Sequence, residues 1–72
     1  MTFEELLKAS ANGLPKVNYN GNIGKVTTIK DNGRYRGCAV NFFGKSYDDW
    51  FHDSDETDKR SKYMRDLTVI PD

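Results

Sequence analysis

The sequence has little cysteine, few apolar residues and no net charge. One cysteine excludes an internal disulfide, and the acidic, amphipathic start is not that of a signal peptide, so we expect a reducing, cytoplasmic setting. No apolar run approaches the roughly 20 residues of a membrane span, so no membrane partner is expected. Hydrophobic residues make up 36% and the mean hydropathy is −0.81, which predicts a thin core. We expect one domain over residues 1–72.

The charges are segregated along the chain although they cancel overall. Residues 16–46 carry six basic side chains against Asp31 alone, a net +5, whereas residues 47–58 carry six acidic side chains and no basic one, a net −6. Opposite charges could pair across the fold and keep it soluble. Alternatively, a basic binding face lies beside an acidic loop, because clustered charge attracts partners even at zero net charge.

A β-hairpin over residues 21–43 is the element around which the chain is organised. Its first arm is rich in β-branched residues, and Asn32-Gly33 predicts a type I′ turn, which needs two residues that tolerate positive φ. In the second arm Cys38, Val40 and Phe42 alternate with smaller or polar residues, so these three side chains are expected to face the core.

The start of the chain predicts a helix over about residues 3–11, within a helix-and-cap unit of residues 1–13. Thr2 and Glu5 form a capping box, and Asn12-Gly13 gives a left-handed stop. Nine residues are too few to form a stable helix alone. We therefore expect the apolar stripe of Phe3, Leu6 and Leu7 to close one end of a barrel.

Further strands are expected over residues 15–19, 47–52 and 65–70, with a helical turn near residues 54–60. The prediction is a mainly β fold, a small five-stranded barrel over residues 15–70 with an N-terminal helix. The series Lys16-Val17, Gly21, Gly24, Val26, Ile29 and then Cys38 to Phe42 resembles the KOW and Tudor class of SH3-like barrels. The resemblance implies a scaffold that binds nucleic acid or protein without catalysis. Phage and mobile-element proteins of this size often resemble this class of barrel.

Basic and aromatic residues interleave in the hairpin and could stack bases and contact phosphates. The candidate binding residues are Lys25, Lys30, Arg34, Tyr35, Arg36, Phe43, Lys45 and Trp50. Trp50 is either a partner-binding anchor or a core residue. Because net neutrality opposes non-specific nucleic-acid binding, the leading hypothesis is a protein-interaction module. The alternative is a nucleic-acid-binding domain that uses the basic hairpin 25–45.

Catalysis and metal binding have weaker support in the sequence. His52 lies among aspartates, but one histidine without a second ligand motif is typical of a solvated strand end. Cys38 with His52 would be a nucleophile and base, yet the alternation places Cys38 in the core. We therefore predict a non-enzymatic protein with no catalytic residue, no metal site and no cofactor.

Overall fold

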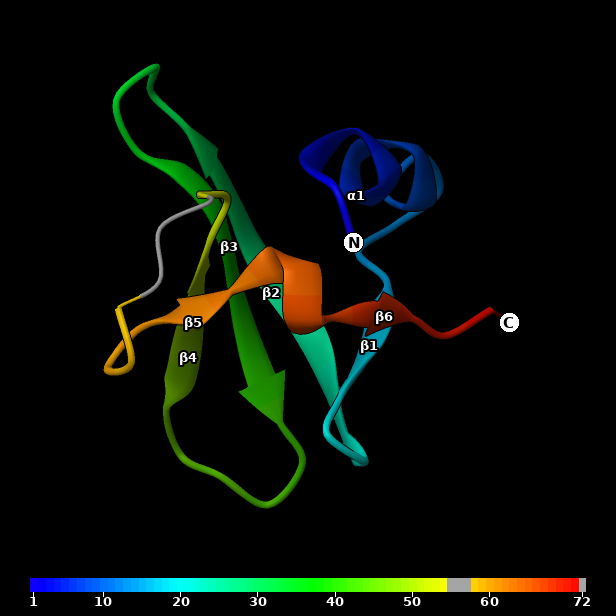
Figure 1. Cartoon of the computed structure of the whole chain (residues 1–72). Coiled ribbons are helices and arrows are strands. Elements are labelled where there is room, and N and C mark those ends of the chain that lie inside the picture. Colours follow the sequence, from blue (N-terminus) through cyan, green and yellow to red (C-terminus); the bar gives the residue numbers. More distant parts are fainter. Residues whose placement is uncertain (55–57, 72) are drawn as a thin grey trace.

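The fold is a curled β-sheet with one helix across one end (Figure 1). The computed structural model describes residues 1–54 and 58–71. The helices are α1 (Phe3–Ala9) and the short 3-10 helix η1 (Met64–Asp66). The strands are β1 (Lys16–Tyr19), β2 (Asn22–Asp31), β3 (Arg36–Phe42), β4 (Asp48–His52), β5 (Lys62–Tyr63) and β6 (Thr68–Val69).

One C-terminal segment pairs with both edges of the sheet. The strand order is β5-β4-β3-β2-β1-β6, with every pair antiparallel except β4 and β5. Because β5 and β6 are joined through η1, their segment draws the edges at β4 and β1 toward each other. The result is a half-barrel whose general shape is compatible with an SH3-like fold.

The mainly β class and the N-terminal helix are confirmed. The predicted number of strands and the predicted single C-terminal strand were wrong. The described residues contain six strands, not five. Within the single strand expected over residues 65–70 only β6, Thr68–Val69, is a strand: η1 occupies residues 64–66, and β5 precedes it outside the predicted range. A straight strand could pair with only one sheet edge, whereas the turn at η1 lets the segment reach two. The helical turn predicted near 54–60 centres on residues 55–57, outside the described residues.

Helix α1 begins at the predicted capping box. The Thr2 hydroxyl accepts from the Glu5 amide, and the Glu5 carboxylate accepts from the Thr2 amide, both at 3.1 Å. Phe3 and Leu6 are buried in the core, whereas Leu7 is 50% exposed. The buried face of α1 is therefore narrower than the predicted stripe, because only two of the three apolar side chains pack on the barrel.

The two Asn-Gly pairs that lie between consecutive strands form different turns. Asn20 and Gly21 have φ of 50° and 86° and join β1 to β2 as a two-residue loop, the positive-φ pair that a type I′ turn requires. At Asn32-Gly33 only the glycine has positive φ, so the type I′ prediction was wrong there. The Asn32 side chain accepts from the amides of Arg34 and Tyr35, at 3.2 and 2.7 Å. This Asx-type bonding stabilises a four-residue loop instead.

A β-bulge in β2 explains how Val26 and Ile29, three residues apart, both contribute to the interior. Val26 pairs with Val40 and Thr28 pairs with Ala39, so Thr27 is the extra residue. Without it, strict alternation would turn Ile29 to the outer face. The buried core cluster consists of Phe3, Leu6, Val17, Val26, Cys38, Val40, Phe42, Phe51, Met64 and Leu67. None of the helices among the described residues is long and apolar enough to cross a membrane.

Candidate functional site

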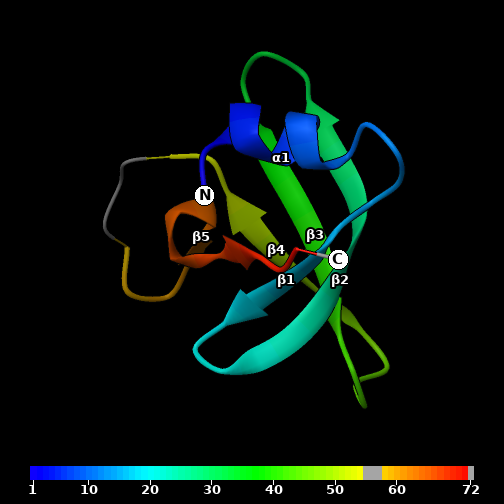
Figure 2. The ribbon, with the colours of Figure 1, turned by 90° about the vertical axis from the view of Figure 1, so that its right-hand side faces the viewer.

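The half-barrel has two unlike ends (Figure 2). Helix α1 lies across one end, on the same side as the loop of residues 32–35, while the β1–β2 turn and the loop of residues 43–47 lie at the opposite end. We call the first the helix end and the second the open end.

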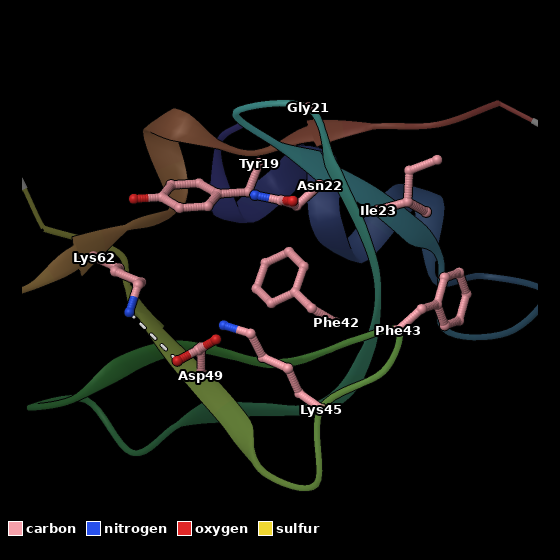
Figure 3. Close-up of a pocket in the computed structure, with 9 residues that line it drawn as sticks. All are labelled: Tyr19, Gly21, Asn22, Ile23, Phe42, Phe43, Lys45, Asp49 and Lys62. Atoms are coloured by element: carbon pink, nitrogen blue, oxygen red, sulfur yellow. Dashed lines mark hydrogen bonds and ion pairs between the residues drawn. The ribbon is translucent and has the colours of Figure 1, made fainter.

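A pocket of about 400 Å³ lies at the open end. Its walls come from the β1–β2 turn, the end of β3, the following loop, β4 and β5 (Figure 3). Tyr19 and Phe42 supply aromatic surface to it, and both rings also pack against Phe51, with centroids 5.1 and 6.0 Å from that ring. The floor of the pocket is therefore a rigid aromatic cluster that continues into the core.

Two of the three charged side chains that line the pocket form an ion pair with each other. The Asp49 carboxylate, only 13% exposed, lies 3.3 Å from the Lys62 amine. Among the described residues, Lys45 has no ion pair; its amine lies 5.9 Å from the ring centroid of Phe42 and 5.4 Å from that of Tyr47. The pocket therefore combines aromatic walls, one neutralised charge pair and one ammonium group without an acidic partner.

The loop of residues 43–47 is held in place from the adjoining strand. The side-chain amide nitrogen of Asn41, Nδ2, lies 3.4 and 3.3 Å from the backbone carbonyls of Lys45 and Tyr47. It also lies 3.0 Å from the Asp48 carboxylate, and all three distances allow a hydrogen bond. Gly44 takes the positive φ of 90° at the bend. One wall of the pocket is thus preorganised, which lowers the entropy cost of binding.

Large apolar side chains gather beside the pocket. Ile23, Phe43 and Tyr47 are 46%, 63% and 58% exposed. Ile23 and Phe43 lie across the β2 ribbon from Tyr19 and Phe42 (Figure 3), and the Phe43 amide donates to the Ile23 carbonyl at 3.3 Å. The open end therefore presents apolar surface both inside the pocket and on its outer rim.

The predicted binding residues do not form one platform. Phe43 and Lys45 line the pocket, whereas Lys25 lies on β2 in a separate pocket that it shares with Lys16. Arg34 and Tyr35 lie in the loop at the helix end, roughly 20 Å away, because the seven-residue strand β3 separates the two groups. Lys30 is exposed near that far end of β2. The structure thus brings together Phe43 and Lys45, places Lys25 in another pocket, and separates all three from Arg34 and Tyr35.

Arg36 connects parts of the fold. Its guanidinium lies 2.6 Å from the Asp53 carboxylate, 4.0 Å from Glu4 and 4.6 Å from the ring centroid of Phe3. The hydrogen bond to Asp53 raises the pKa of Arg36. An arginine with these partners links α1 to the end of β4, and its charge is already compensated.

Trp50 lies on the outer face of β4, half-buried and outside the core cluster. A Cβ at Gly37 would lie only 3.0 Å from Cζ2 of Trp50, so the indole packs closely over the bare backbone of β3. Its Nε1 donates to Nδ1 of His52 at 3.2 Å. Trp50 is therefore neither a core residue nor a fully exposed anchor. One part of its side chain packs on the sheet, and the rest is accessible.

Cys38 and His52 lie on opposite faces of the sheet. Cys38 pairs with Phe51 and is fully buried, whereas the next residue of β4, His52, is half-buried on the outside. Burial raises the pKa of the Cys38 thiol to about 11. A buried, protonated thiol with its side chain across the sheet from the imidazole is not an activated nucleophile.

Much of the acidic block pairs with basic residues. Asp53 binds Arg36, Asp58 lies 3.7 Å from Arg60, and Asp49 binds the amine of Lys62. These contacts agree with the interpretation that opposite charges pair across the fold. Within residues 1–54 and 58–71, His, Cys, Asp and Glu side chains form no group of three or more that could hold a metal ion.

Of the nine residues that line the pocket, the predicted binding residues include only Phe43 and Lys45. Among those that sequence reasoning missed, four have side chains that matter to the site: Tyr19, Ile23, Asp49 and Lys62. Ile23 could have been found, because it shares an outward-facing position with Lys25 in an alternating strand. The other three come from segments far apart in the sequence. Comparison of the chain with family models, with curated proteins and with solved structures gives no significant match.

Proposed function

We propose that this chain is a non-enzymatic, intracellular binding module that holds a segment of a protein partner at the open end of the half-barrel. The observation that carries the proposal is the pocket of about 400 Å³ with aromatic walls, rimmed by exposed Ile23 and Phe43. Small-molecule and side-chain pockets commonly have volumes of roughly 300–1,000 Å³ and apolar linings. Aromatic anchors also dominate the energy of protein interfaces.

Within the SH3-like class, we propose a relationship to KOW and Tudor domains. Its support is the succession of a short strand, a tight turn at Gly21, a bulged strand containing Val26 and Ile29, and a return strand that ends at Phe42. An origin in a phage or mobile element stays a prediction.

Nucleic-acid binding through the basic hairpin 25–45 has less support. The platform would need Arg34, Tyr35 and Arg36 beside Phe43 and Lys45, but these groups lie at opposite ends of β3. The charge of Arg36 is compensated by Asp53. A binding groove for a single strand needs a continuous basic and aromatic surface.

Selection from a displayed library of random dodecapeptides on the immobilised domain tests the proposal. We expect enriched peptides whose affinity falls about tenfold or more in Phe43→Ser, because an exposed aromatic anchor would be lost. Tyr35→Ser is the matched control, since Tyr35 is 60% exposed and Phe43 is 63% exposed, at opposite ends of β3. No enrichment, or equal losses in both variants, would refute the proposal.

A further inference from the structure

Among the residues that the structure describes, the pocket at the open end holds more basic than acidic side chains. Lys62 is paired with Asp49, but among the described residues no acidic side chain forms an ion pair with Lys45. The Lys45 amine lies over the rings of Phe42 and Tyr47 instead. Lys45, Lys62 and Asp49 together give the pocket a net charge of +1, from two cations and one anion.

A second pair of lysines lies on the outer side of the sheet, in a separate pocket formed with residues 9, 12–15 and 69–71. Lys25 follows Ile23 by two residues on the outer side of β2, and Lys16 lies directly opposite Lys25 in β1. Both are exposed, and neither forms an ion pair within the described part of the chain. Like charges directly opposite each other destabilise a strand pair. An anionic group from a partner would relieve this repulsion.

We propose, on the basis of the binding function above, that the partner segment is acidic. An apolar side chain of the segment enters the pocket against Tyr19 and Phe42. Carboxylates next to it lie at Lys45, and a further one lies at the Lys16–Lys25 pair. The domain therefore recognises an apolar side chain of the segment that has aspartate or glutamate next to it. Lys45 is the residue that sets the preference for acidic sequences.

The pocket chemistry favours a peptide over a nucleic acid. The large exposed aromatic side chains are divided between the two ends of β3: Phe43 and Tyr47 lie at the open end, and Tyr35, with a similar exposure, lies at the helix end. Stacking along a single strand uses successive aromatic side chains. A concave pocket fits one branched or aromatic side chain better than a run of bases.

The test compares peptide selections on three forms of the full chain: wild type, Lys45→Glu and Lys30→Glu. The two variants change the net charge equally, but Lys30 lies on β2 toward the helix end. We expect acidic residues next to an apolar residue among peptides enriched on wild type and on Lys30→Glu, and no such enrichment on Lys45→Glu. The most enriched acidic peptide should bind Lys45→Glu about fivefold or more weakly, and Lys30→Glu within about twofold of wild type.

The two proposals fail in different ways. Enrichment of neutral or basic peptides that still depend on Phe43 would overturn the acidic partner and leave the peptide-binding function standing. Acidic enrichment that persists on Lys45→Glu would overturn the role of Lys45. Absence of any enrichment would overturn both proposals. Micromolar binding of a labelled oligothymidylate that displaces the selected peptide would replace the peptide with a nucleic acid.

Discussion

The helix end of the barrel is closed by buried side chains of α1, although Leu7 and Tyr35 are exposed there, whereas the open end has a pocket with exposed apolar side chains around it. At the helix end Phe3 and Leu6 are almost completely buried against the sheet, and Arg36 fixes α1 to the end of β4. At the open end Ile23, Phe43 and Tyr47 remain about half exposed around a pocket. A chain with so few apolar residues would gain stability from burying them. We propose that the partner segment covers these side chains.

The largest expected effect is at the helix end. Leu6→Ala should lower the free energy of unfolding by about 2–5 kcal/mol, because it leaves a cavity in the core. Leu7→Ala, one residue further along the same helix, should cost less than about 0.5 kcal/mol, since its side chain is 50% exposed. Urea denaturation of both variants measures the difference. Equal losses would mean that α1 does not close the barrel as described.

A smaller effect is expected at the loop beside α1. Gly33 has φ of 83° and open space where a Cβ would lie, so a substitution there meets backbone strain and no steric contact. Gly33→Val should cost on the order of 1 kcal/mol, and Gly33→Asn clearly less, because asparagine tolerates the left-handed region. Thermal melting of the two variants provides the comparison. If valine melts at the wild-type temperature, the loop does not constrain the hairpin.

The contacts of Arg36, which link α1 to the end of β4, should contribute less to the stability of the fold than the two features above. Arg36→Ala removes the contacts to Asp53, Glu4 and Phe3, whereas Arg34→Ala removes an exposed guanidinium 5.8 Å from the Tyr35 ring centroid. We expect a lower melting temperature for Arg36→Ala alone, with the gap narrowing as salt screens the ion pairs. A drop of the same size in Arg34→Ala would show that the loss reflects net charge.

The smallest effect concerns the pH dependence of the capping box. Hydrogen bonds from Thr2, the backbone amide first, lower the pKa of Glu5 below its ordinary value of 4.5. A lowered carboxylate pKa contributes stability that is present above pH 4.5 and is lost as the pH falls through the folded value. The difference in melting temperature between wild type and Glu5→Gln should therefore shrink on acidification below that pH. A difference that stays constant down to pH of about 2 would contradict the capping role.

The elements with local signals could be predicted from the sequence. The capping box at Thr2 and Glu5 fixes the start of α1, and alternation places Cys38, Val40 and Phe42 in the core. Two identical Asn-Gly pairs, however, gave a type I′ turn at Asn20 and a longer loop at Asn32. The side-chain oxygen of Asn32 accepts hydrogen bonds from the backbone amides of Arg34 and Tyr35, and these bonds depend on the conformation of the whole loop.

Features that depend on contacts between distant segments were not predictable. The C-terminal segment divides at η1 because it pairs with two sheet edges, and no local pattern records that closure. The pocket requires Tyr19, Asp49 and Lys62 to meet through the curl of the sheet. Interleaved charge and aromatic residues in the hairpin suggested a single surface, but the length of β3 separates its two ends. Spacing along a chain does not reveal such a separation when a strand lies between the groups.

The most direct test is to map where an enriched peptide binds, by titrating it into isotope-labelled protein and following the backbone amide signals. We predict saturable shifts concentrated at residues 19–23, 42–47 and 62, around the pocket at the open end. The amides of α1 and of the loop of residues 32–35 should change little. Shifts centred on α1 or on that loop would contradict the account, because they would place the partner at the end that the chain itself already covers.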